Sequence, residues 1–272
     1  MNRTTFFAYA RRAPFGGRLT QSQIDGMNAI LDEWERRRVL DNRWLAYILA
    51  TAFHETGNRM QAVRETFASS DAQAISRLES AWTAGKLPWV KTPYWRDGWF
   101  GRGLVQITHK ANYAKFGITK ADALKLDVSV RVIFDGMIKG MFTGKTLGDY
   151  FNSTTNDPVG ARKIVNGTDK AKLIASYYQN FLDAMEAARE AVEPPDVKKE
   201  DAKPDDVPAT QSKSLWTILL TIFPGLGGLA FLEKIDNVFS LGAFALVVVA
   251  ILIAGWLVLT GRVTINRGKS AA

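Results

Sequence analysis

Two glutamates, Glu55 and Glu65, carry the clearest chemical signal in the chain. They lie in the run ATAFHETGNRMQAVRET, and an aromatic, glycine-rich run, TPYWRDGWFGRGLVQITHKANY, follows. Cleavage of a glycosidic bond requires two acids near a sugar-sized aromatic surface. One acid protonates the leaving oxygen, while the other activates water on the opposite face of the ring. The residue types therefore point to hydrolysis of a glycosidic bond.

The local sequence predicts a different setting for each acid. Glu55 ends an apolar helical pattern, and apolar surroundings favour the protonated carboxyl that a general acid needs. Glu65 follows ten residues later, beyond a break at Gly57-Asn58, so the chain can reverse and present it across a cleft. Taken alone, Glu55 is more simply interpreted as the partner of an arginine such as Arg59, and Glu65 as a surface residue. The interpretation therefore depends on the surrounding motifs.

Metal-dependent and nucleophilic mechanisms are disfavoured by the residues available. His54-Glu55 opens a zinc-protease signature, but the position four after His54 is Asn58, and His109 is the only other histidine. No nucleophile-elbow pattern supports a Ser-His-Asp triad. The absence of cysteine excludes thiolate ligands and disulfides. We expect neither a metal nor a cofactor.

The glycine-rich run offers several groups to a ligand. Gly101 and Gly103 allow the backbone to approach a ligand closely, and Arg102 can anchor the turn or a carboxylate. The Thr108 hydroxyl donates and accepts, which is what orienting a water molecule requires. The aromatic side chains that can stack on sugar rings, although each is singly more often a core residue, are Tyr94, Trp95, Trp99 and Phe100.

Apolar spacing over residues 1–192 is mostly helical and predicts a mainly α domain with few strands. Helices are expected from Asp41 or Asn42 to Glu55, from Ser70 or Asp71 to Gly85, from Val128 to Phe142, from Asp157 to Val165 and from Asp169 to Ala191. The 272 residues, 47% of them hydrophobic, allow one sizeable core plus something smaller. The net charge of +8 suits an anionic partner, and nucleic acid is disfavoured because no known binding signature appears.

The chain after residue 192 changes character. Residues 193–213 contain four prolines and almost no large apolar side chain, so we expect a disordered, solvated linker. The run at 238–261 has no charged residue from Ser240 onward and exceeds the roughly 20 apolar residues that a transmembrane helix needs. The run at 214–232 is interrupted by proline and glycine, which leaves a membrane span, a re-entrant segment or an interfacial helix open, with a two-span hairpin favoured. The basic tail at 262–272 then predicts a cytoplasmic C-terminus.

Three blocks together resemble the signature regions of family 19 glycoside hydrolases, in particular their phage endolysin branch. The blocks are HETG at 54–57, GRGLVQITHKANY at 101–113 and ARKIVNG at 161–167, in the family's order. The resemblance spans roughly residues 40–190. It implies a mainly α, two-lobed lysozyme-like fold with a substrate cleft, and inverting cleavage of β-1,4 bonds between amino sugars.

The resemblance also implies roles for individual residues. Glu55 corresponds to the general acid, Glu65 to the second catalytic carboxylate and Thr108 to the residue that helps hold the attacking water. Substrate-binding counterparts are Gln106, Asn112 and Asn166, to which the residue types add Arg102, Tyr94 and Trp99. The interval between the two acids is shorter than in plant chitinases, which favours peptidoglycan over chitin as the substrate.

The sequence therefore predicts a membrane-anchored endolysin that degrades peptidoglycan from the inner membrane of a host cell. Its expected partners are bacterial peptidoglycan and, through the C-terminal segment, membrane lipid, with no nucleic acid. A chitinase of the same family is one alternative. The other is a holin-like or structural membrane protein whose wall-binding domain is not catalytic.

Overall fold

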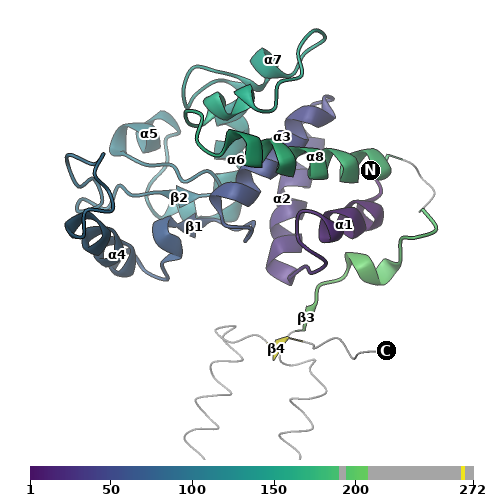
Figure 1. The fold of residues 1–272 in the computed structure, drawn as a ribbon, viewed down its shortest axis with the longest axis horizontal. Helices are drawn as coiled ribbons and strands as arrows, with labels where there is room; N and C mark the ends of the chain where they lie inside the picture. The colour runs from purple at the N-terminus through teal and green to yellow at the C-terminus, as the bar shows by residue number, and fades with distance from the viewer. Residues whose placement is uncertain (190–193, 208–264, 267–272) are drawn as a thin grey trace, which may run out of the picture. The chain divides into compact units, whose positions relative to one another are not determined.

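α-Helices dominate the part of the chain that the structure describes, which is residues 1–189, 194–207 and 265–266 of a computed structural model (Figure 1). The eight helices in those residues are α1 (Arg3–Arg12), α2 (Gln21–Arg37), α3 (Asn42–Glu55), α4 (Asp71–Thr83), α5 (Lys110–Lys115), α6 (Leu126–Ile138), α7 (Leu147–Tyr150) and α8 (Ala171–Ala187). Four 3₁₀ turns accompany them, η1 (Glu65–Phe67), η2 (Asp122–Leu124), η3 (Gly160–Ile164) and η4 (Lys199–Ala202). The prediction of a mainly α chain is confirmed.

The larger hydrophobic core is organised around α3, which packs along α8. The Asp41 side chain caps α3 by accepting a hydrogen bond from the Arg43 N–H at 3.0 Å. Near the other end of α3, the Phe53 ring lies 4.7 Å from that of Tyr177 and 6.0 Å from that of Phe181. Because α3 is buried along most of its length, its last residue, Glu55, has a fixed position.

A second, smaller core lies beneath α4, at the side of the helical unit away from α1 and α8 (Figure 1). Trp95 and Phe100 are fully buried there, against Leu78 of α4. A two-stranded antiparallel sheet joins β1 (Val63–Arg64) to β2 (Arg102–Gly103). The backbone of the segment before Glu65 is thereby hydrogen-bonded to the glycine-rich run.

The observed helices differ from the predicted ones mainly at their ends. α3 and α4 begin at the predicted residues, whereas α6 stops at Ile138, because Gly140 adopts a φ of +68° that ends the helix. The segment predicted as a helix from Asp157 forms only the short turn η3. α1 and α2 were not predicted, although a capping box between Thr20 and Gln23 marks the start of α2.

The helical unit extends to Lys203, beyond the predicted domain end at residue 192. Within residues 194–203, predicted as part of the linker, η4 packs against α1. The Arg11 side chain is the reason, because its buried guanidinium donates to the backbone carbonyls of Asp201, at 2.6 Å, and of Lys203. Composition alone gives no sign of this contact.

A second unit comprises residues 204–272, of which the structure describes only short stretches. In it β3 (Asp206–Val207) pairs antiparallel with β4 (Ile265–Asn266). The predicted segments 214–232 and 238–261 lie outside the described residues, as does the tail at 262–272 apart from β4. Among the described helices, none is both long and apolar enough to cross a bilayer.

Replacing Arg11 with Ala should destabilise the protein, because the carbonyls of Asp201 and Lys203 would lose a charged donor and residues 194–203 their anchor on α1. One hydrogen bond to a charged group contributes about 1.5–3 kcal/mol, so we expect a loss of at least that size in the free energy of unfolding. Denaturant titration of the full-length chain measures it. Arg96→Ala is the matched control, since its exposed ion pair with Glu79 involves no residue of 194–203 and such pairs contribute about 0–1 kcal/mol. Equal losses in the two variants would contradict the docking of residues 194–203.

Candidate active site

A groove of about 580 Å³ brings together several of the predicted site residues. Those that line it are Tyr94, Gln106, Thr108, Asn112 and Asn166. Four of them belong to the aromatic, glycine-rich run, whereas Asn166 lies more than fifty residues later, so the fold brings that residue to the others. A larger hollow of about 770 Å³, around Trp34 and Met185, contains none of the predicted site residues. The smaller groove is therefore the candidate site.

Hydrogen bonds to the backbone fix the side chains along one wall of the groove. The Gln106 amide donates to the carbonyls of Val63, at 3.1 Å, and Gly103, at 2.9 Å. The Thr108 hydroxyl donates to the Gln106 carbonyl at 2.9 Å, and the Asn112 amide donates to the Thr108 carbonyl at 2.8 Å. These bonds use the Thr108 hydroxyl hydrogen and both N–H groups of Gln106, but only one N–H of Asn112. The side-chain oxygens can therefore accept from a ligand, and Asn112 keeps one N–H to donate.

Glu65 lies behind this wall and is held by two donors. The Tyr94 hydroxyl donates to Oε1 at 2.9 Å, and the Gly101 N–H donates to Oε2 at 2.7 Å. Burial, together with the charge of Glu65, raises the pKa of Tyr94 above its usual value, so the phenol stays protonated as a donor. Because Tyr94 lines the groove, a single hydrogen bond connects Glu65 to it.

Gly101 is required by this arrangement. A Cβ atom at that position would lie 2.9 Å from Oε1 of Gln106 and 3.3 Å from Oε2 of Glu65. Any side chain at position 101 would therefore push both groups away. Gly101, the first glycine of the GRG motif, therefore allows the Glu65 carboxylate and the Gln106 amide to lie close to the backbone.

Glu55 meets an arginine rather than an apolar wall alone. Its Oε1 lies 2.7 Å from Nη1 of Arg162, and the two side chains are 16% and 5% exposed. The expected alternative partner, Arg59, instead stacks on the Phe67 ring at 3.9 Å. Burial lowers the pKa of the adjacent His54, although the charge of Glu55 opposes that shift, so the imidazole adds no positive charge at pH 7.

Arg162 was missed as a site residue. It belongs to the ARKIVNG block, but a basic residue in a short turn usually faces solvent, whereas this one is buried. Its carbonyl accepts hydrogen bonds from the N–H groups of Val165, at 3.2 Å, and Asn166, at 3.0 Å, and both of those residues line the groove. Glu55 is therefore linked to the groove through the turn that contains Arg162.

The segments that carry the two acids also pack on each other directly. Phe67 lies two residues after Glu65, and Gly57 lies two residues after Glu55. A Cβ atom on Gly57 would come within 2.7 Å of Cζ of Phe67, so only glycine allows this contact. The fold thus brings the HETG and VRET segments together, although neither acid is among the residues that line the groove.

Backbone strain concentrates in the same segments. Eight non-glycine residues in the described part of the chain have a positive φ, and three of them, Arg38, His109 and Lys170, flank helices. The other five are Asn58, Met60, Thr66, Phe67 and Gln106, with φ between 50° and 61°. Such conformations cost on the order of 1–3 kcal/mol each and cluster at functional sites. Their distribution supports the candidate site independently of the motifs.

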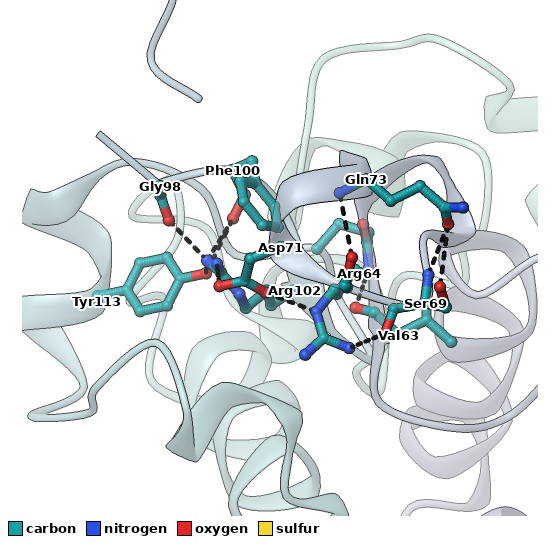
Figure 2. A network of polar contacts seen from close by, with 11 residues as sticks. Val63, Arg64, Ser69, Asp71, Gln73, Gly98, Phe100, Arg102 and Tyr113 are labelled. Carbon is teal, nitrogen blue, oxygen red and sulfur yellow. Dashed lines mark hydrogen bonds and ion pairs between the residues drawn. The ribbon is translucent and has the colours of Figure 1, made fainter. Parts of the chain in front are cut away.

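Arg102 lies in the interior, not in the groove. Figure 2 shows its guanidinium between Gly98, Phe100, Tyr113 and Asp71. It donates to the Gly98 carbonyl and to Oδ2 of Asp71, each at 2.8 Å, and is fully buried. Arg102 was predicted to bind substrate. In the structure it instead anchors the turn and pairs with a carboxylate of the protein itself, Asp71.

The aromatic residues divide between core and surface. Trp95 and Phe100 are fully buried, and the Trp99 ring packs on Tyr113 at 5.2 Å beside Lys120, so none of the three lines the groove. The groove instead has Trp89 at its edge, a residue that is 72% exposed and was missed. Its position in KLPWVKTP, between two prolines in a loop, was the available signal.

Comparisons with known proteins give no family for this site. The chain matches no protein-family model, no curated protein and no solved structure. Within the described residues, no group of three or more His, Cys, Asp or Glu side chains is arranged to hold a metal ion. The chemistry of the groove therefore follows from its own residues.

Replacing Asp71 with Asn should lower thermal stability in a pH-dependent way. Burial tends to raise the pKa of Asp71, but hydrogen bonds from Arg64 and Arg102 outweigh it, so the pKa is lowered. A carboxyl whose pKa falls on folding stabilises the protein above its unfolded pKa of about 3.9, and this stabilisation is lost as the pH falls further.

The Tm of Asp71→Asn should therefore lie below that of the wild type at pH 7, and the gap should close below about pH 4. Calorimetry across that range measures both values. Asp97→Asn, at an exposed aspartate, is the control and should leave Tm unchanged. A gap that stays constant with pH would argue against the charged network in Figure 2.

Proposed function

We propose that the chain is an endolysin that hydrolyses β-1,4 glycosidic bonds of peptidoglycan by an inverting mechanism. The groove is the observation that carries this proposal, because residues of both expected substrate-binding blocks line it. Each of the two acids is also connected to the groove through one neighbouring residue. Glu65 is tied through Tyr94, and Glu55 through Arg162. The resemblance to family 19 glycoside hydrolases assigns catalysis to the same two residues.

Glu65 suits the role of the general base. A base must be a carboxylate before it takes a proton from water. Both groups that contact it, the Gly101 N–H and the Tyr94 hydroxyl, donate hydrogen bonds, so both favour a charged oxygen acceptor. Thr108, on the wall of the groove, is the hydroxyl proposed to orient the attacking water.

Glu55 is the proposed general acid. Arg162 contacts Oε1 and leaves Oε2 to face the leaving group, but a guanidinium favours the ionised form of its partner, so the role of general acid rests on the resemblance and not on this contact. Arg162 is itself held by a bond from its Nε to the Asp169 carbonyl at 3.1 Å. The carboxyl therefore has a fixed orientation, and orientation contributes strongly to acid catalysis.

The division into two hydrophobic cores supports a two-lobed, lysozyme-like domain. The larger core surrounds α3, which ends in Glu55, and the smaller one lies under α4. Glu65 contacts Tyr94, which packs against the smaller core. The two acids are thus supported by different cores, as a two-lobed enzyme requires. Anchoring in the inner membrane of a host through residues 214–261 belongs to the same proposal.

A second candidate function is binding to the cell wall without catalysis. One observation favours it, which is that both acids are engaged by protein donors and neither lines the groove. In that case the Glu55–Arg162 pair and the Glu65 bonds serve only the fold. The membrane part of the chain would then have the holin-like or structural role.

Digestion of purified peptidoglycan with the full-length chain in mild detergent distinguishes the candidates. The proposed enzyme releases new reducing sugars, identified by mass spectrometry, and the first product seen by NMR is the α-anomer because inversion places water opposite the leaving group. Chitin oligosaccharides, tested in parallel, address the chitinase alternative. Binding to peptidoglycan without release of sugars would support the non-catalytic candidate.

Glu55→Gln and Glu65→Gln should each lower the lytic rate by about 10²–10⁴-fold, because each removes one proton-transfer group. The rate is measured per folded molecule, since Glu55→Gln also breaks the ion pair with buried Arg162. Glu79→Gln is the matched control, because that carboxylate bonds Arg96 and Trp95 outside the groove. A folded variant that keeps the wild-type rate would remove that acid from the mechanism.

Thr108→Val should lower the lytic rate while changing stability little, because it keeps the shape of the side chain and deletes the hydroxyl. The hydroxyl also donates to the Gln106 carbonyl, a neutral bond that contributes about 0.5–1.5 kcal/mol. Thr108→Ser restores the hydroxyl and should restore the rate. If Thr108→Val unfolds the domain and Thr108→Ser behaves as wild type in both measurements, Thr108 has a packing role instead.

A further inference from the structure

Glu65 is separated from the groove by the groups that hold it. The carboxylate is not among the residues that line the groove, and each of its oxygens accepts a hydrogen bond from the protein. Of the two donors, Tyr94 lines the groove and Gly101 does not. A general base acts on a proton within hydrogen-bond reach, either directly or through one bridging water. The Tyr94 hydroxyl occupies the position of such a bridge.

The Tyr94 ring is held by two aromatic neighbours. The centroid of the Trp95 ring lies 5.0 Å away in an edge-to-face arrangement, and Trp95 is fully buried in the smaller core. The His109 ring, which also lines the groove, packs edge to face at 4.9 Å. These contacts hold the phenol oxygen between the Glu65 carboxylate and the groove.

The Tyr94 hydroxyl has the groups that a proton relay requires. It uses its hydrogen to bond Oε1 of Glu65 at 2.9 Å, so its oxygen lone pairs can accept from a water molecule in the groove. Burial, together with the charge of Glu65, raises the pKa of Tyr94. The phenol therefore does not lose its proton before it gains another, and the two transfers occur together.

We propose that Tyr94 relays a proton from the attacking water to Glu65. One O–H bond of the water breaks, its proton bonds to Oη of Tyr94, and its electron pair stays on the water oxygen, which bonds to the anomeric carbon. The original hydroxyl proton of Tyr94 passes to Oε1 of Glu65. The bond from the anomeric carbon to the leaving oxygen breaks, and that oxygen takes its proton from Glu55. Exchange with solvent then returns Glu65 to the carboxylate and Glu55 to the acid.

This inference rests on the proposed function, because it supplies the route by which the proposed base reaches the water. It also accounts for the observation that favours the non-catalytic candidate, since a base that acts through Tyr94 need not line the groove. Tyr94 was predicted to bind substrate, and the relay gives its hydroxyl a different task from that of its ring.

Tyr94→Phe tests the relay, because it deletes the hydroxyl and keeps the ring with its two aromatic contacts. With the full-length chain in mild detergent and soluble peptidoglycan strands, kcat per folded molecule should fall about 10²–10⁴-fold, as for Glu65→Gln, while KM stays unchanged. The double variant should be no slower than the slower single variant, because one relay is lost in each case. Tyr178→Phe is the matched control, since its hydroxyl bonds Asn156 at 3.2 Å outside the groove, and it should keep the wild-type rate.

Two kinetic outcomes would overturn the relay. The first is a Tyr94→Phe variant that keeps the wild-type kcat. The second is a double variant in which the two losses multiply, because independent effects would mean that Tyr94 does not act through Glu65.

The position of the attacking water separates a relay from a tyrosine that only orients Glu65. In a crystal structure of the full-length Glu55→Gln chain with a glycan strand bound, the relay places this water about 2.6–3.2 Å from Oη of Tyr94 and beyond hydrogen-bond reach of Glu65. A water bonded directly to Glu65 would make Tyr94 a positioning residue and overturn the relay. Because Tyr94 is intact in this chain, the result does not depend on how Tyr94→Phe folds.

The outcome is separable from that of the proposed function. If the wild type releases sugars and Glu65→Gln is slow while Tyr94→Phe is not, only the relay is wrong and Glu65 remains the base. If the wild type releases no sugars, the proposed catalysis is wrong and the relay with it.

Discussion

The buried guanidinium of Arg102 is the constraint on which the candidate site depends. A charge removed from water costs several kcal/mol unless its hydrogen bonds are supplied by the protein. Here they come from the turn at 98–100, from Asp71 at the start of α4 and from Tyr113 in α5. The two Nη groups are satisfied in this way, whereas the buried Nε has no partner, and their bonds hold three separate pieces of chain together. The smaller core forms where they meet, since Phe100 stacks on the guanidinium at 3.7 Å.

The same arrangement positions the groove. Because Arg102 pairs with Arg64 in the β1–β2 sheet, the residue before it, Gly101, faces Glu65. Glu65 and Gly101 exchange backbone and side-chain hydrogen bonds, with the Glu65 N–H donating to the Gly101 carbonyl at 2.7 Å. Two strained residues lie close to this contact in the chain. Thr66 directly follows Glu65, and Gln106 lies five residues after Gly101. A strained backbone conformation persists only where the surrounding contacts hold it in place. Here the network around Arg102 supplies those contacts.

Local patterns were sufficient for the parts of the fold that depend on local physics. Apolar spacing and the Asp41 cap predicted α3, and the Ser70 cap predicted α4, because capping and periodicity are properties of neighbouring residues. The motif blocks also predicted four side chains that line the groove, Gln106, Thr108, Asn112 and Asn166, and the residue types added Tyr94. Contacts between distant charged residues were not predictable in this way. Arg11 and Arg162 were not singled out from the sequence, and Arg102 was expected to anchor its turn or a carboxylate and to bind substrate. Each is buried against backbone or carboxylate groups whose identity only the tertiary structure supplies.

The two acids differ in the kind of partner each has, and this difference connects binding to chemistry. Glu65 is held by neutral donors on a wall fixed by backbone hydrogen bonds, so its position does not depend on a ligand. Glu55 is held by Arg162, whose carbonyl also accepts the N–H of Asn166. Asn166 lines the groove, so a ligand that contacts it acts on the turn that orients the Glu55 carboxyl. In the proposed mechanism one turn therefore both orients the general acid and presents Asn166 to the sugar, while the general base is held by the neutral donors Tyr94 and Gly101.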